Sequence, residues 1–173
     1  MAKTTARVSV IMGSDSDWPL MKSAVTTLRS FGVEVEVRVL SAHRSPEAAA
    51  AYAASARERG LQVLIAAAGG AAHLAGVLAA HTPLPVIGVP VKGGALDGLD
   101  ALLSMVQMPA GIPVATVALG SAGPVNAVIL AVQMLALHDA SLMERLLEHK
   151  KSLALKVESA NARVQAELQA GNV

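Results

Sequence analysis

The sequence predicts an α/β fold in which five parallel strands alternate with helices, followed by one long C-terminal helix. Short apolar runs alternate five times with helix-length segments, which is typical of a parallel sheet with right-handed crossovers. The hydrophobic fraction of 53% is ample for a packed core, and 173 residues suit one domain. We expect residues 1–173 to form a single domain, with an α/β core at 6–139 and the long helix at 140–169.

The first strand is predicted at residues 7–12, a β-branched run that ends at a glycine. Aspartate and proline are residue types favoured at the start of a helix, so Asp17 and Pro19 predict a helix that begins here with Asp17 as its N-cap. That helix is expected to run to about residue 31 and to close at Gly32. Residues 33–40 are rich in valine and predict the second strand.

An alanine-rich helix is predicted at residues 46–60, with Gly60 as its C-terminal stop. Residues 62–68 are almost entirely apolar, as a strand covered on both faces should be. A further helix is expected at 71–81. The apolar stretch 61–80 has about the length of a membrane-spanning helix. The Gly69-Gly70 pair in its middle favours a strand, a turn and a helix instead.

The second half continues the alternation, with strands expected at 86–89 and 114–119 and helices at 96–106 and 124–137. From Ser141 onward there are no strand signals. Apolar residues recur there at spacings of mostly three, four or seven, which predicts one stripe of a long helix. They are Leu142, Leu146, Leu153, Val157, Ala160, Val164 and Leu168. We infer that part of this stripe packs on another subunit; a tail lying on its own domain is the alternative.

The composition excludes several classes of function. The net charge is +1 and aromatic residues make up 2%, so the basic patch and stacking platform of a nucleic-acid binder are missing. There are no cysteines, which excludes disulfides and thiolate sites. No histidine and carboxylate pair has metal-ligand spacing, so no metal is expected. Residues 1–5 lack the apolar stretch of a secretory signal, and we expect a cytoplasmic protein.

Three loops rich in glycine and polar residues follow the first three predicted strands. They occupy residues 13–17, 41–46 and 69–73. Ligands of open parallel sheets bind beyond the carboxyl ends of the strands, where the strand order reverses. On the assumption that the strand order is 2-1-3-4-5, these loops converge on one site.

The first loop combines Gly13, Ser14 and Ser16 with a helix N-terminus, which favours an anion such as phosphate. Asp17 either caps the helix or accepts hydrogen bonds from sugar hydroxyls. An ordinary turn and cap is the plain alternative for this loop.

The second and third loops carry the residues suited to chemistry. Arg44 can hold phosphate or carboxylate through two parallel N–H bonds, and an imidazole such as His43 exchanges a proton near neutral pH. The alternative is a helix-start loop with exposed polar residues. In the third loop Gly70 leaves backbone amides open to a ligand. His73 either contacts ligand or satisfies a buried backbone group.

Together these loops resemble the motifs of a known enzyme family. The motifs are Met-Gly-Ser-Asp-Ser-Asp-Trp at 12–18, Ser-Ala-His-Arg-Ser-Pro at 41–46, Ala-Gly-Gly-Ala-Ala-His-Leu at 68–74, Gly-Val-Pro-Val at 88–91, Gln-Met-Pro at 107–109 and Gly-Ile-Pro-Val at 111–114. In order and spacing they are similar to those of the N5-carboxyaminoimidazole ribonucleotide mutases of purine biosynthesis, and the likeness extends to about Asp139.

The resemblance implies a three-layer flavodoxin-like fold with strand order 2-1-3-4-5 and a homo-octamer with sites at subunit contacts. It implies an isomerase that moves a carboxyl group from the exocyclic nitrogen of an aminoimidazole ribonucleotide to a ring carbon, giving 4-carboxy-5-aminoimidazole ribonucleotide. No ATP, metal, biotin or other cofactor is implied. In the family, the carbamate loses CO₂, which stays trapped and is recaptured by the ring carbon.

By the same match, His43 shuttles the proton. By this match Ser14, Asp17 and Arg44 hold the ribose phosphate part, and Ser41, Gly70, Ala71 and His73 line the region of the base and carboxylate. Gly13 and Ser16 of the first loop are further candidates for substrate binding. The chain departs from the family at Ser45, where threonine is frequent, and in the segment 92–94.

Two rival functions remain. The nearer one is the related carboxylase that uses CO₂ directly on aminoimidazole ribonucleotide; its motifs tend to have a lysine and other residues in place of those at 41–46 and 69–73. The other is a non-enzymatic signalling module on the same fold. A phosphate-receiving module needs an aspartate at the end of the third strand, where this chain has Ala68 and Gly69.

Overall fold

The computed structural model describes residues 4–171, so the first three residues, on which the expectation about a secretory signal partly rests, lie outside the described part. Five strands form one sheet in the order β2-β1-β3-β4-β5, with every neighbouring pair parallel. This confirms the predicted fold class and strand order. The strands are β1 (Val8–Met12), β2 (Val35–Val39), β3 (Val63–Gly69), β4 (Val86–Val91) and β5 (Ala115–Thr116).

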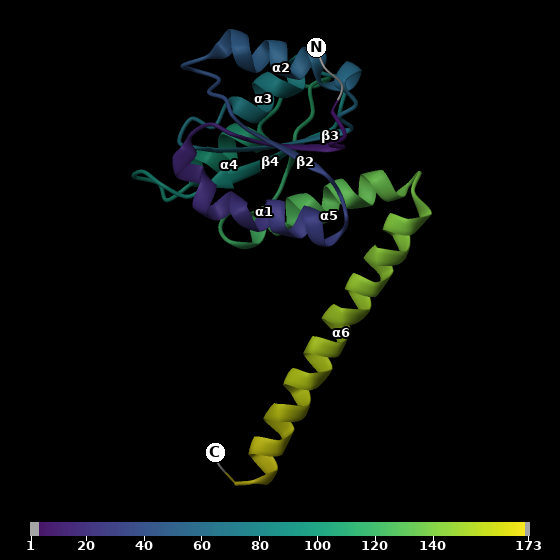
Figure 1. The fold of residues 1–173 in the computed structure, drawn as a ribbon. Helices are drawn as coiled ribbons and strands as arrows, with labels where there is room; N and C mark the ends of the chain where they lie inside the picture. Colours follow the sequence, from purple (N-terminus) through teal and green to yellow (C-terminus); the bar gives the residue numbers. More distant parts are fainter. Residues whose placement is uncertain (1–3, 172–173) are drawn as a thin grey trace. The chain divides into compact units, whose positions relative to one another are not determined.

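Helices follow each strand and cover both faces of the sheet (Figure 1). In that view α2 and α3 lie above the sheet and α1 below it. The helices are α1 (Trp18–Ser30), α2 (Pro46–Arg59), α3 (Leu74–Ala80), α4 (Leu99–Val106), α5 (Ala122–Ala136) and α6 (Ala140–Gln169). The chain divides into two compact units, Met1–Val132 and Gln133–Val173.

The centre of the sheet is buried, as the sequence predicts for strands covered on both faces. All five residues of β1 are buried, and so are the first six residues of β3. Gly60 ends α2 with a left-handed backbone, φ 105°, which is the expected glycine stop. Of the residues described, no helix is long and apolar enough to cross a membrane.

β5 is much shorter than predicted: it covers two residues in place of 114–119. The carbonyl of Gly88 in β4 accepts a hydrogen bond from the Val117 N–H at 3.0 Å. In a strand, the backbone N–H and C=O groups of successive residues point alternately to the strand on one side and the strand on the other. After Gly88, the next β4 residue whose backbone faces β5 is therefore Pro90. Proline has no N–H, so the ladder cannot continue.

Two predicted helix starts were also too early. Helix α3 begins at Leu74 rather than at 71, and α4 begins at Leu99 rather than at 96. Before α4, Asp97 has φ 47° and Gly98 has φ 91°, and two successive residues with positive φ cannot belong to a right-handed helix. Apolar periodicity alone does not reveal such a break.

The predicted long helix is confirmed as α6, of 30 residues. Its N-cap is Asp139, whose carboxylate accepts the Leu142 N–H at 3.3 Å. Leu142 and Leu146 are buried, whereas four later members of the predicted stripe are exposed, Leu153, Val157, Val164 and Leu168, and Ala160 is partly exposed. The packing of this stripe on another subunit stays a prediction.

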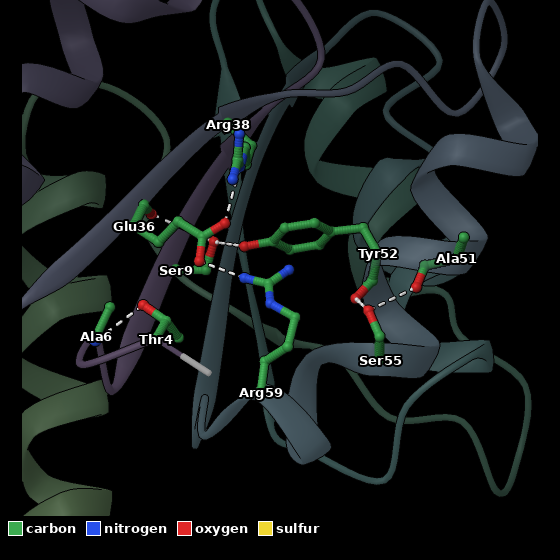
Figure 2. A network of polar contacts seen from close by, with 9 residues as sticks. All are labelled: Thr4, Ala6, Ser9, Glu36, Arg38, Ala51, Tyr52, Ser55 and Arg59. Atoms are coloured by element: carbon green, nitrogen blue, oxygen red, sulfur yellow. Dashed lines mark hydrogen bonds and ion pairs between the residues drawn. The ribbon is translucent and has the colours of Figure 1, made fainter. Parts of the chain in front are cut away.

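A polar network joins α2 to strands β1 and β2 (Figure 2). The Glu36 carboxylate receives the Arg38 Nε–H at 2.8 Å and also pairs with Arg59. The Arg59 guanidinium lies over the Tyr52 ring, 4.6 Å from its centroid. The Tyr52 hydroxyl in turn is 2.6 Å from the Ser9 hydroxyl of β1. This network fixes α2, and with it the loop before α2, against the edge of the sheet.

The network makes folding stability depend on pH through Glu36. Burial by itself raises the pKa of this carboxyl, but the hydrogen bonds and charges of Arg38 and Arg59 outweigh burial and hold the pKa below its ordinary value. A carboxyl with a lowered folded-state pKa stabilises the fold above its ordinary pKa, and the contribution is lost as pH falls through the lowered value.

We therefore expect Glu36→Gln to lower the free energy of unfolding at pH 7 by about 1–3 kcal/mol, because the buried Arg59 loses its charged partner. The loss should begin to shrink as pH falls below the ordinary glutamate pKa of about 4.3, and should disappear only below the lowered folded-state pKa, where the wild-type carboxyl is also neutral. Urea unfolding of the wild type and of Glu36→Gln, carried out from pH 3 to 7, measures this difference in the free energy of unfolding. The exposed Glu34 on the same segment provides the matched control, Glu34→Gln, and an equal loss in both variants would exclude the network as the cause.

Candidate active site

The sheet register brings the carboxyl ends of four strands to one edge. The Gly13 N–H donates to the Ala67 carbonyl at 3.0 Å, and the Leu40 N–H donates to the Met12 carbonyl at 2.9 Å. Gly69 lies opposite Val91 in the β3–β4 ladder. A pocket of about 460 Å³ opens at this edge, within the first compact unit.

The pocket brings together every residue that the sequence predicts for the site. Those residues are Gly13, Ser14, Ser16, Asp17, Ser41, His43, Arg44, Gly70, Ala71 and His73. Sequence reasoning missed the other lining residues, which are Ala42, Ala68, Gly69, Leu74 and Val91 to Gly94. The strand-end rule, had it been applied to β4 as well, would have found the segment after Val91.

The first loop is folded on itself by its own side chains. The Ser14 hydroxyl accepts the Ser16 backbone N–H at 3.3 Å and lies 2.9 Å from the Ser16 hydroxyl. The Ser14 N–H donates to Asp17 Oδ2 at 3.3 Å. These contacts form a capping box around the short 3₁₀ turn at Asp15–Asp17. Two serine hydroxyls and the start of α1 are thereby held at the pocket wall.

Asp17 does not cap α1 in the predicted way. It stands at the N-cap position of α1, but its carboxylate closes the preceding turn by accepting the Ser14 N–H. Asp17 is only 7% exposed, and burial raises its pKa, while the Ser14 hydrogen bond lowers it and the neighbouring Asp15 raises it further. The Asp17 carboxylate therefore holds the first loop in shape rather than capping α1.

The second loop is arranged by Ser41 and Ser45. The Ser41 hydroxyl accepts the backbone N–H groups of His43 at 3.3 Å and Arg44 at 3.1 Å. The Ser45 hydroxyl donates to the Ser41 carbonyl at 3.1 Å and accepts the Ser41 N–H at the same distance. The turn that presents His43 and Arg44 is therefore held by hydrogen bonds within the loop itself.

Arg44 reaches from the second loop to the first. Its Nη2 donates to the Gly13 carbonyl at 3.1 Å, and its Nε is 3.5 Å from the Ser41 hydroxyl. The guanidinium thus stands beside the serine-rich first loop. A guanidinium, two hydroxyls and a helix start on one wall are the groups that bind a phosphate monoester.

His43 and His73 face each other across the pocket wall. His43 Nε2 and His73 Nδ1 are 2.8 Å apart, and the two rings meet edge to face at 85°. His73 is exposed, so it does not satisfy a buried backbone group, which was one of its two predicted roles. One nitrogen of such a contact must donate and the other must accept, so the pair shares a proton between two imidazoles.

The site has no arrangement for a metal ion in the part of the chain that the structure describes: residues 4–171 contain no group of three or more His, Asp or Glu side chains positioned to hold one. A proton-carrying imidazole pair lies beside an anion site and a wall of glycine and alanine.

The fold and the pocket define a class: a parallel α/β protein with strand order 2-1-3-4-5 and a pocket at its strand ends, lined by residues of the kinds that bind a small phosphorylated ligand. Residues 7–156 match the sequence profile of the AIR carboxylase family. The chain belongs to that family.

Individual relatives agree with this assignment. The chain is 59% identical to an N5-carboxyaminoimidazole ribonucleotide mutase of Mycobacterium tuberculosis over 159 residues, covering 92% of this chain and 90% of the relative. It is 53% identical to the mutase of the same name from Pyrococcus horikoshii, covering 91% and 88%. The crystal structure of Treponema denticola PurE superposes with a TM-score of 0.81 at 26% identity, covering 90% of this chain and 96% of that one.

Proposed function

We propose that this protein is an N5-carboxyaminoimidazole ribonucleotide mutase, an isomerase of purine biosynthesis. It moves the carboxyl group of the carbamate from the exocyclic nitrogen to the ring carbon and so forms 4-carboxy-5-aminoimidazole ribonucleotide. The observation that carries the proposal is the meeting of His43 with His73 in the pocket that Ser14 and Arg44 also line. The relatives that bear this name support the choice of substrate.

The reaction needs one proton to be delivered and one to be taken away. In the first step the N–C bond of the carbamate breaks, CO₂ leaves, and the nitrogen keeps the electron pair and receives a proton from His43. In the second step the ring carbon attacks CO₂, and the proton on that carbon returns to His43 as the C–C bond forms. The protons balance, so one imidazole serves as acid and then as base.

The wall of the pocket suits the retention of CO₂ between the two steps. Ala42, Ala68, Ala71 and Leu74 line it, and these apolar side chains offer no hydrogen bonds to water. Holding CO₂ beside the ring carbon makes its recapture an effectively unimolecular step. The phosphate, held by Ser14, Ser16 and Arg44, anchors the nucleotide throughout, and Asp17 accepts from a ribose hydroxyl.

Further parts of the proposal rest on the resemblance to the family. We propose that residues 1–173 work as one catalytic domain, that eight copies assemble with their sites at subunit contacts, and that the protein acts in the cytoplasm. The exposed apolar side chains of α6, Leu153 and Val157 among them, supply a surface for such an assembly.

The runner-up is a carboxylase that adds CO₂ directly to aminoimidazole ribonucleotide. One relative, from Vigna aconitifolia, is named a chloroplastic phosphoribosylaminoimidazole carboxylase; it is 58% identical over 141 residues, and the match covers 82% of this chain and 25% of that longer protein. The name of that relative does not distinguish the two carboxyl donors, so a direct assay is needed.

The assay supplies purified protein with either the carbamate ribonucleotide or aminoimidazole ribonucleotide plus dissolved CO₂, without ATP and with a metal chelator. The first reaction is run in an alkaline buffer without added bicarbonate, and carbonic anhydrase is added so that released CO₂ is converted quickly to bicarbonate. We expect product from the carbamate at an undiminished rate. Product from aminoimidazole ribonucleotide and CO₂ alone, with none from the carbamate once free CO₂ is removed, would establish the carboxylase instead.

A further inference from the structure

The loop after β4 supplies a second cation to the pocket. Lys92, Gly93 and Gly94 line the cavity, although no role follows for them from the family motifs. Of the side chains that line the pocket, Arg44 and Lys92 carry a permanent positive charge near neutral pH. They stand at opposite ends of it, Arg44 after β2 and Lys92 after β4.

The order of the strands sets the spacing of the two cations. Neighbouring strands lie roughly 4.8 Å apart, so the tip of β4 is about 10 Å from the tip of β1, with β3 between them. A phosphate held at Ser14 and Arg44 therefore leaves the heterocycle to extend along the His43–His73 pair toward β4. The carboxyl-bearing end of the nucleotide then comes nearest to the β4 loop.

We infer that Lys92 binds the carboxylate of the substrate and of the product, while Arg44 binds the phosphate. The inference rests on the proposed function, since it assigns the second anionic group of that same ligand. The nucleotide has anions at both ends, and each end then meets one cation. A lysine suits the carboxyl end, because a compact charge on a flexible four-carbon stem can follow the carboxyl group from nitrogen to carbon.

Lys92 forms an ion pair with Asp97 of the same loop. The Lys92 Nζ lies 3.0 Å from Asp97 Oδ2, and the two side chains are 55% and 76% exposed. An ion pair this exposed contributes little, so a bound carboxylate can replace Asp97 at small cost. Asp97 has φ 47°, a backbone conformation that asparagine adopts as readily as aspartate, so Asp97→Asn removes the charge without straining the loop.

The experiment measures the affinity of two nucleotides by calorimetry. One is the product, 4-carboxy-5-aminoimidazole ribonucleotide, and the other is aminoimidazole ribonucleotide, which has the phosphate but no carboxyl group. We expect Lys92→Gln to weaken binding of the carboxylated nucleotide by about ten-fold, in the range of a charge-assisted contact, and to change binding of the other less than two-fold. Lys92→Arg should restore most of the loss.

Two further variants complete the test. Asp97→Asn should strengthen binding of the carboxylated nucleotide alone by about two-fold, because a weak competitor is removed. Lys22→Gln removes the same charge from α1, outside the pocket lining, and should leave both affinities unchanged.

Equal weakening of both nucleotides by Lys92→Gln, or no weakening of either, overturns the role of Lys92 and leaves the proposed function standing. Wild-type protein that binds neither nucleotide contradicts the proposed function and this inference with it.

Discussion

Replacing His43 by asparagine is expected to lower turnover of the carbamate ribonucleotide by about 10²–10⁴-fold, the usual contribution of a general acid or base. Asparagine can hydrogen-bond but cannot carry a proton between nitrogen and carbon. The turn around position 43 should persist, because it is held by backbone N–H groups donating to Ser41. Affinity for the product nucleotide, measured by calorimetry, should change only a few-fold.

The matched control is His81→Asn. His81 lies at the end of α3 and is exposed, away from the residues that line the pocket. The His81→Asn variant should retain full turnover. Normal turnover by the His43 variant would remove this imidazole from the mechanism. Loss of both turnover and affinity would make His43 a binding residue rather than the proton carrier.

Replacing Arg44 by alanine is expected to weaken binding of aminoimidazole ribonucleotide by about 10–100-fold, since hydrogen bonds to charged groups contribute about 1.5–3 kcal/mol. The guanidinium stands beside the first loop through its hydrogen bond to the Gly13 carbonyl. Its removal takes away the main positive charge facing the phosphate. The loss of affinity should become smaller as salt concentration rises, because salt screens the charge in the wild type.

Arg57→Ala is the control for this variant. Arg44 lies just before the first residue of α2, whereas Arg57 is exposed near the C-terminal end of that helix. It should leave the affinity unchanged. Arg44→Lys should restore part of the loss but not all of it, since an ammonium cannot form two parallel N–H bonds. An unchanged affinity in Arg44→Ala would contradict the phosphate role.

The sequence predicted the fold well because strong local signals agreed with one another. The continuous apolar run of β3 indicated a strand buried on both faces, and Gly60 marked the end of α2. β5 was misjudged in length because its ladder is stopped by Pro90 on the neighbouring strand. The length of β5 is therefore set by its pairing with β4, and the residues of β5 alone do not reveal it.

The site was predicted through its loops, and the same reasoning explains what it missed. Loops after the first three strands were recognised by their polar residues and motifs. Lys92 was overlooked as a site residue because the segment 92–94 departs from the family, and its place at the pocket depends on β4 lying beside β3. The contact between His43 and His73 likewise joins two loops 30 residues apart, so neither loop indicates it alone.

The central claim is that the carboxyl group never leaves the pocket as it moves from nitrogen to carbon. It is tested by supplying carbamate ribonucleotide labelled with ¹³C in the carboxyl group, in a buffer rich in unlabelled bicarbonate and carbonic anhydrase. The ¹³C content of the product carboxyl is then measured by mass spectrometry. We expect the product to keep most of the label; a label diluted to the level of the buffer would contradict transfer within this pocket.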